Sequence, residues 1–549
     1  MKRKYLLLMV CTLLYSCSPS PQGGEQTVPE GGQPTAGTFD EPHRPQFHFT
    51  PPAKWMNDPN GMVYHNGEYH LFYQHNPDTT VWAPMHWGHA VSRNMVHWEH
   101  LPIALYPDRL GMIFSGSAVV DHGNTAGFGS AGNPAMVAIY TYHDMEGERA
   151  GRNDYQSQGI AYSLDNGRSW TTYANNPVLK SPGIRDFRDP KVSWYEEGQK
   201  WVMALAVADK ISFYSSPNLK DWKKESDFGG GAIGAYGGVW ECPDLFKLRV
   251  EGTDQEKWVL LVSINQGGPN RGSATQYFIG DFDGNKFVLD EQFKKDLRTL
   301  TGIAKNVKGQ EGIWIDYGRD NYAGVTWANV PKEDGRRLFM GWMSNWNYAN
   351  VVPTEAWRSA MTLPRTLTLQ NTPAGLRLVS LPVKETDTLV AATHAVPAQM
   401  VSASLNLSES LPAPTATFRL NLELESAQAG SGFVIELSNA QNQKMLIGYD
   451  PQQQRYYTDR TQAGNHDFSD QFASVNYAPR LATGSTYSLQ LWVDVASVEL
   501  FADGGQTVMT DIFFPDEPFT QVRLIPKDGQ VKLKSGEIAE LKSIYNPSI

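Results

Sequence analysis

The sequence predicts an all-β protein with two domains. From about Arg44 to Leu369, short apolar stretches are separated by Gly, Pro, Asn and Asp, and long segments with helical periodicity are absent. Within this region a strand, a polar turn and a second strand containing Trp recur, reaching Trp98, Trp170 and Trp222. This repeat is weak and unevenly spaced, but it is typical of blade-like sheets. The 549 residues exceed the usual size of a single core, so a second domain is expected.

A change in the sequence pattern after about Thr366 predicts the second domain. Polar and proline-containing stretches at about 371–412 give way to a clean alternation of apolar and polar residues, in Phe418–Leu424 and again in Leu489–Val495. Alternation places every second side chain on one face, as in half-buried antiparallel strands. We therefore expect an antiparallel β domain at the C-terminal end.

The N-terminus predicts export. Met1–Val10 has a basic head and an apolar run that is too short to span a bilayer permanently. The segment Leu14–Cys17 resembles a bacterial lipobox, in which the cysteine is lipidated and becomes the first residue. The alternative is a plain signal peptide that contains Cys17. We expect residues 1–17 to be a lipoprotein signal peptide, and Cys17 to anchor the protein to the cell surface or the periplasmic face of a bacterial membrane.

Residues 18–40 predict a flexible tether, because they are rich in Pro, Gly, Ser and Thr with few apolar residues. If Cys11 and Cys17 belong to the signal, Cys242 is the one cysteine left in the folded body. An intrachain disulfide is then not expected there.

Asp58 is the first candidate catalytic residue. It lies in the stretch Trp55–Gly61, between two amides and two turn formers. A residue before proline is pushed toward extended geometry and Asn-Gly favours a tight turn, so Asp58 is expected to sit rigidly at a strand end, as a nucleophile requires. The alternative is an ordinary turn.

Two further acids lie in similarly distinctive stretches: Asp189 in Arg185–Lys191 and Glu241 in Trp240–Phe246. Singly, each stretch is also compatible with a surface turn or loop. Together with Trp55–Gly61, and in this order, they resemble glycoside hydrolase family 32, the β-fructosidases. The resemblance covers nearly the whole chain after the first forty or so residues, and continues through the segments Tyr69–Pro77, Phe114–Ser117, Asp316–Ala323 and Gly341–Trp346.

The resemblance implies a five-bladed β-propeller catalytic domain over residues 41–370, followed by a linker and a C-terminal β-sandwich over residues 371–549. Trp492–Phe501 resembles a strand of the family's β-sandwich. For this second domain we expect a structural role, packed against the propeller, with sugar binding as the alternative.

The resemblance also assigns roles to the three acids. Asp58 corresponds to the nucleophile, Glu241 to the acid that protonates the leaving oxygen and later activates water, and Asp189 to a stabiliser of the transition state. Arg188 is expected to favour the ionised form of Asp189, whereas nearby anions and burial are expected to raise the pKa of Glu241. The family positions associated with gripping the terminal fructose are Trp55, Asn57, Gln74, Trp82, Phe114, Ser115, Arg188, Trp342 and Trp346. The last two tryptophans are also compatible with a place in the core.

Composition narrows the choice of partners. A net charge of −11 argues against nucleic acid, because a basic surface to meet phosphates is lacking. Sixteen Trp and 11% aromatic residues suit a neutral sugar, whose C–H faces pack on rings. His86–His89 and Asp281–Gly284 superficially suggest zinc and calcium sites, but their spacing favours structural histidines and a turn. We expect neither metal nor cofactor, and read Cys242 as a small packing residue.

The resemblance thus predicts a retaining β-fructosidase that releases fructose from levan or inulin. Sucrose remains open as a further substrate. Trp82 resembles the aromatic wall of exo-acting members, so exo action is expected. The protein is also expected to be a monomer. An endo-levanase or an invertase is the alternative within the family. A non-catalytic fructan-binding surface lipoprotein is the alternative outside the enzyme class, disfavoured because binding alone does not require a paired nucleophile and acid.

Overall fold

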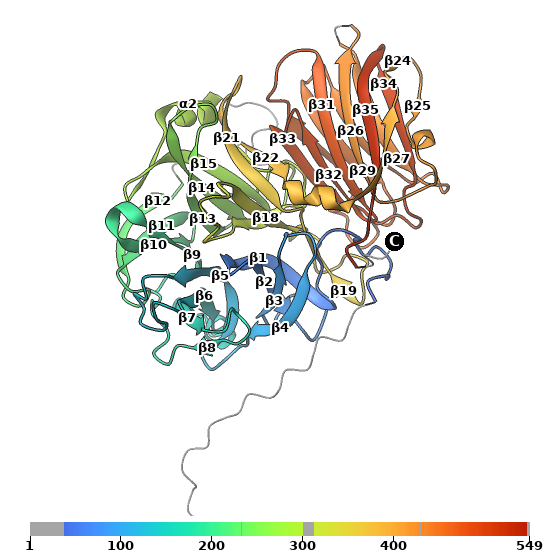
Figure 1. Ribbon diagram of the computed structural model, residues 1–549. Helices are drawn as coiled ribbons and strands as arrows, with labels where there is room; N and C mark the ends of the chain where they lie inside the picture. The colour runs from blue at the N-terminus through green and yellow to red at the C-terminus, as the bar shows by residue number, and fades with distance from the viewer. Residues whose placement is uncertain (1–37, 232, 300–311, 429, 546–549) are drawn as a thin grey trace, which may run out of the picture.

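The structure is a computed structural model that describes residues 38–231, 233–299, 312–428 and 430–545. The predicted signal peptide with Cys17, and the predicted tether up to residue 37, lie outside these residues. Strands dominate the described chain (Figure 1). Its helical elements are short: α1 (Met145–Arg149), α2 (Glu291–Thr299), η1 (Glu196–Gly198), η3 (Lys384–Leu389) and η4 (Ser408–Ser410). None of the described helices is long and apolar enough to cross a membrane.

Five antiparallel sheets follow one another along the first part of the chain. The first contains β1 (Lys54–His65), β2 (Glu68–Asn76), β3 (His86–Ser92), β4 (Glu99–Leu105) and, in parallel, the short β19 (Trp357–Arg358). The second contains β5 (Met112–Asp121), β6 (Ala135–His143), β7 (Gln156–Ser163) and β8 (Thr171–Thr172). The third contains β9 (Phe187–Tyr195), β10 (Lys200–Val207), β11 (Lys210–Ser216) and β12 (Lys223–Gly229). The fourth contains β13 (Trp240–Arg249), β14 (Glu256–Ile264), β15 (Ala274–Phe282) and β16 (Phe287–Leu289). The fifth contains β17 (Tyr322–Thr326), β18 (Arg337–Met343), β20 (Ala360–Met361), β21 (Arg365–Thr372) and β22 (Gly375–Pro382).

The first strands of the five sheets form a closed ring. β1 contacts β5, β5 contacts β9, β9 contacts β13, β13 contacts β17, and β17 returns to β1. These inner strands are mostly buried along their length, because each is covered by its neighbours in the ring and by the next strand of its own sheet. The predicted five-bladed propeller is confirmed.

The sequence repeat corresponds to the same hairpin in three blades. In each, the tryptophan precedes the outermost strand, and its indole N–H donates to the carbonyl of the residue three positions earlier: Trp98 to Met95, Trp170 to Gly167 and Trp222 to Leu219, all at 3.0 Å. The repeat therefore marked the outer edge of blades one to three.

Each inner strand is irregular in its pairing with the next strand of its sheet. The pairing register shifts within Met56–Pro59 of β1, within Ile113–Gly116 of β5, opposite Ala204–Ala206 in β9, within Glu241–Asp244 of β13, and within Tyr322–Val325 of β17. A bulge changes the direction in which side chains point, compared with a regularly pleated strand. Four of these strands contribute residues to the walls of the site described below, and Tyr322 of the fifth contacts Glu241 there.

The second domain is a sandwich of two sheets, which confirms the predicted β-sandwich. One sheet contains β23 (Val390–Val396), β24 (Gln399–Val401), β26 (Phe418–Ser426), β31 (Thr486–Asp494), β32 (Ser497–Ala502), β33 (Thr507–Ile512) and β35 (Val531–Leu541). The other contains β25 (Leu405–Asn406), β27 (Gly432–Ser438), β28 (Lys444–Asp450), β29 (Arg455–Gln462), β30 (Val475–Pro479) and β34 (Gln521–Lys527). Burial alternates along β26, as its sequence predicts.

A buried polar network joins the two domains. His48, just before β1, contacts Asp494 at 2.8 Å and Glu499 at 2.9 Å. Arg365 of the last blade pairs with Glu499 and, at 3.0 Å, with Asp316. Because all these side chains are buried, each charge depends on its partner in the other domain or loop. The sandwich is thereby fixed beside the first and fifth blades, as Figure 1 shows.

Candidate active site

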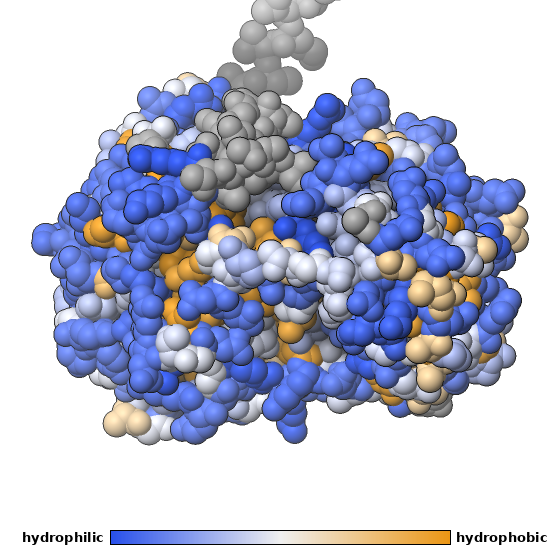
Figure 2. All heavy atoms as spheres, turned by 90° about the horizontal axis from the view of Figure 1, so that it is seen from above, coloured by the Kyte–Doolittle hydropathy of each residue, from blue (hydrophilic) through white to orange (hydrophobic). Residues whose placement is uncertain are grey.

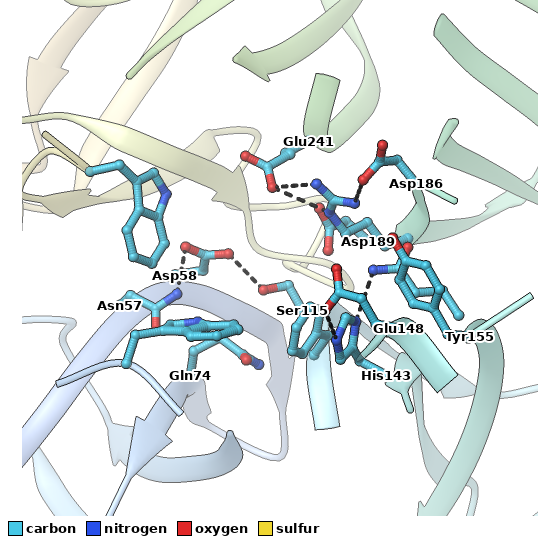
Figure 3. A pocket seen from close by; sticks show the side chains of 15 residues that line it. Asn57, Asp58, Gln74, Ser115, His143, Glu148, Tyr155, Asp186, Asp189 and Glu241 are labelled. Atoms are coloured by element: carbon cyan, nitrogen blue, oxygen red, sulfur yellow. Dashed lines mark hydrogen bonds and ion pairs between the residues drawn. The ribbon is translucent and has the colours of Figure 1, made fainter. Parts of the chain in front are cut away.

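Four of the bulged strands, β1, β5, β9 and β13, contribute residues to the walls of a cavity of about 290 Å³. Figure 3 shows that Asp58 from β1, Asp189 from β9 and Glu241 from β13 all face it. Its walls are formed by Asn57, Asp58, Gln74, Trp82, Phe114, Ser115, His143, Glu148, Tyr155, Gln156, Asp186, Arg188, Asp189, Glu241 and Trp346.

Asp58 is held by donors on both oxygens. The Asn57 amide donates to Oδ1 at 3.0 Å, and the Ser115 hydroxyl donates to Oδ2 at 2.7 Å. The Cys242 thiol also lies 3.4 Å from Oδ2. Burial, together with the charge of Glu241, raises the pKa of Asp58 above its ordinary value, and the hydrogen bonds from Ser115 and Asn57 offset this rise only in part. The carboxyl group is therefore fixed in direction, with donors that favour its anion.

Asp189 has a left-handed backbone, φ +62°, in the β9 bulge. Its Oδ2 accepts a hydrogen bond from the Cys242 backbone N–H at 3.0 Å. Arg188 favours the ionised form of Asp189, as expected, but burial has the larger effect. Burial raises the pKa of Asp189 to about 7, and the lowering effect of Arg188 does not offset it.

Glu241 is held between two blades. The Arg188 guanidinium donates to Oε1 at 2.9 and 3.2 Å, and it also pairs with Asp186 at 2.6 Å. The Tyr322 hydroxyl of β17 donates to Oε2. Arg188 therefore reaches across to Glu241, although the sequence places it beside Asp189.

Most of the predicted sugar contacts reach the cavity: Asn57, Gln74, Trp82, Phe114, Ser115, Arg188 and Trp346 line it. Trp55 and Trp342 do not line it. Both are fully buried and pack against Trp346, with ring centroids 6.0 and 4.9 Å away. Trp55 also donates from its indole to the Asn57 carbonyl oxygen at 2.7 Å. The structure places these two rings as supports for Asn57 and Trp346.

Several wall residues were not identified from the sequence: His143, Glu148, Tyr155, Gln156 and Asp186. Asp186 lies in the stretch that contains Asp189, so its neighbourhood was a usable signal. The other four lie at the end of β6, in α1 and at the start of β7, where no local pattern marks a site. Cys242 is buried with a free thiol, as its interpretation as a packing residue expects, and its backbone also holds Asp189.

The two metal-like motifs have ordinary structural surroundings. His89 lies in β3 and contacts His70 at 3.0 Å, while Asp283 accepts hydrogen bonds from the backbone of Asn285 and Lys286 in a turn. Within the part of the chain that the structure describes, no group of three or more His, Cys, Asp or Glu side chains is arranged to hold a metal ion.

The site can act on a glycosidic bond. Two carboxyl groups that face one cavity, one held by Asn57 and Ser115 and the other by Arg188 and Tyr322, are the kind of pair that glycoside hydrolysis through a nucleophile and an acid requires. The third, Asp189, lies between Arg188 and Cys242 and can bind sugar hydroxyls.

The chain matches the family descriptions "Glycosyl hydrolases family 32 N-terminal domain" over residues 48–382 and "Glycosyl hydrolases family 32 C terminal" over residues 385–540. It is 44% identical to the levanase of Bacillus subtilis, over 99% of this chain and 76% of that protein. It is 39% identical to the extracellular exo-inulinase of Aspergillus niger, over 93% of this chain and 97% of that protein. The crystal structure of the exo-inulinase of Aspergillus awamori has a TM-score of 0.82 and 36% identity, covering 92% of this chain and 99% of that chain.

Proposed function

This chain belongs to glycoside hydrolase family 32 and is a β-fructosidase, and from that premise we propose that it releases single fructose units from the ends of β-fructans, with retention of configuration. The observation that carries the proposal is the convergence of Asp58, Asp189 and Glu241 on one cavity. Levan and inulin are the proposed substrates, with sucrose as a smaller alternative.

In the proposed reaction, Asp58 attacks the anomeric carbon while Glu241 donates a proton to the leaving oxygen. The bond between the sugars breaks, and a fructosyl ester of Asp58 forms. Glu241, now a base, takes a proton from water, whose oxygen displaces Asp58 and returns it as a carboxylate. Asp189 binds hydroxyls of the fructose ring as positive charge develops there.

The shape of the cavity supports exo action. Trp82 packs edge-to-face on Phe114, with centroids 5.8 Å apart, and its backbone N–H donates to Asn350 at 2.9 Å. This contact ties the loop between β2 and β3 to the loop after β18. A wall closed in this way accommodates a chain end more readily than a chain interior.

The experiment is a time course on levan, inulin and sucrose, with products separated by chromatography at early conversion. Fructose as the main early product supports the proposal. A ladder of short oligosaccharides with little free fructose would overturn exo action and favour an endo-levanase. Binding of fructan without any hydrolysis would favour the non-catalytic alternative.

We also propose that the protein is exported, carries a lipid on Cys17, and works as a monomer. The extracellular relative supports export. A monomer is supported by the surface: in the described chain few large hydrophobic side chains are exposed, and the face in Figure 2 is mainly hydrophilic. The proposed division is a signal peptide (1–17), a tether (18–40), the propeller (41–370) and the linker with the sandwich (371–549). Because β22 extends to Pro382, the last blade continues past residue 370.

A further inference from the structure

Glu148 of α1 lies at the mouth of the cavity. Among the charged side chains of its walls, exposure rises from 10% for Arg188 and 16% for Glu241 to 31% for Asp186 and 36% for Glu148. Side-chain exposure therefore increases from the buried end of the cavity, near Asp58 and its donors, to the open end, near Glu148.

A chain of hydrogen bonds sets the orientation of Glu148. The backbone N–H of Phe187 donates to the Gln156 carbonyl oxygen at 2.7 Å, so the Gln156 amide nitrogen faces His143. That nitrogen lies 3.1 Å from His143 Nδ1, and His143 Nε2 lies 3.1 Å from Glu148 Oε2. Because Gln156 offers N–H groups to Nδ1, the imidazole proton must be on Nε2, which donates to Glu148.

The imidazole is fixed and buried. It stacks on Phe114 with centroids 4.2 Å apart and planes 10° apart, and Tyr155 packs edge-on at 5.2 Å. Burial lowers the pKa of His143, against the raising effect of Glu148, which agrees with the neutral tautomer. In the described chain, Glu148 Oε1 has no hydrogen-bond partner, so one oxygen of a fixed carboxylate is available at the cavity mouth.

We propose that Glu148, positioned by His143, binds the hydroxyls of the second fructosyl unit, the one on the leaving side of the bond that is cut. This subsite rests on the proposed function. With the terminal fructose among Asn57, Gln74, Ser115 and the three acids, the next sugar must extend through the mouth, past Glu148. Sugar hydroxyls are donors, and a carboxylate is the strongest acceptor that the chain can offer them.

The test compares two substrates that share the terminal fructose but differ in the leaving group. One is a fructan trisaccharide, and the other is an aryl β-fructoside, which lacks the second sugar. Glu148→Ala is expected to lower kcat/KM on the trisaccharide about tenfold more than on the aryl fructoside, the scale of one hydrogen bond to a charged group. Glu146→Ala, on the exposed side of the same helix, is the matched control and should leave the ratio of the two kcat/KM values unchanged.

His143→Phe tests the positioning role, because it keeps a ring on Phe114 but removes the donor to Glu148. The ratio should change in the same direction, and the double variant should lose no more than Glu148→Ala alone. Equal losses on both substrates, or an unchanged ratio in Glu148→Ala, would overturn the subsite alone. A wild-type protein that hydrolyses neither substrate would overturn the proposed function, and the subsite with it.

Discussion

Arg188 of β9 donates two hydrogen bonds to Glu241 of β13, at 2.9 and 3.2 Å, so that one oxygen of the proposed acid is held by the neighbouring blade. Tyr322 holds the other oxygen from the opposite side. The orientation of Glu241 therefore depends on three blades at once. Its orientation is sensitive to residues of the neighbouring blades.

Glu241→Ala is expected to remove most activity on natural fructans, whose alkoxide leaving group needs a proton. An aryl fructoside with a good leaving group should recover the first step in part. Steady-state and burst kinetics on the two substrates measure this difference. If both substrates lost activity equally, the assignment of Glu241 as the acid would be wrong.

Asp58→Asn is expected to lower kcat by roughly three orders of magnitude or more, because an amide cannot supply the anionic nucleophile. The fold should persist, since Asn is isosteric and Asp58 is a buried group whose charge is costly. The measurements are hydrolysis of inulin and the thermal unfolding midpoint. Near-wild-type turnover by a well-folded variant would refute the nucleophile assignment.

Ser115→Ala should move the acidic limb of the kcat/KM profile to higher pH. The Ser115 hydroxyl lowers the pKa of Asp58, so its removal raises that pKa and delays ionisation of the nucleophile as pH increases. The shift should be about one pH unit. Ser117→Ala is the control: Ser117, on the same strand, donates to the Pro190 carbonyl. A shift in the control of equal size would contradict the specific role of Ser115.

Because of His48, the free energy of unfolding should decrease at alkaline pH. Burial alone lowers its pKa, but the hydrogen bonds to Asp494 and Glu499 prevail and raise it to about 9. Because folding raises the pKa of His48, its protonation stabilises the folded protein fully below the unfolded pKa of about 6.5. This stabilisation is lost as pH rises through about 9. The loss amounts to about 3 kcal/mol, measured by urea unfolding across that range. His48→Gln should flatten this part of the profile, whereas the exposed His97→Gln should leave it as in the wild type.

Cys17→Ala should move the protein from the membrane fraction to a soluble fraction, because a lipid chain on Cys17 is the proposed anchor. Fractionation followed by immunoblotting measures the distribution. An unchanged distribution would show that something other than Cys17 holds the protein at the membrane.

The three acids were predicted from the sequence through the family resemblance, which rests on short stretches rich in prolines and turn residues. The structure shows these stretches as bulges in β1, β9 and β13. The regular alternation of β26 and the Trp repeat likewise depend on neighbours in sequence, and both correspond to the expected elements.

The residues that were missed depend on tertiary contacts. His143 and Glu148 reach the cavity because ring closure places the connection between β6 and β7 above it, and nothing in their own segment indicates this. Trp342 and Trp346 are equally suited to bind a sugar, yet packing buries Trp342 fully and leaves Trp346 half-buried in the cavity wall. Arg188 adjoins Asp189 in sequence, but backbone direction sends its guanidinium to Glu241.

The parallel pairing of β1 with β19 has a consequence for the order in which the protein assembles. The strand that carries Asp58 finds its partner on that side at Trp357 and Arg358, near the end of the propeller. During synthesis this side of β1 stays unpaired until most of the chain has been made. Contacts between residues far apart in the sequence also form slowly. A chain truncated before Trp357 would therefore contain all three acids and lack the strand that pairs in parallel with the strand of Asp58.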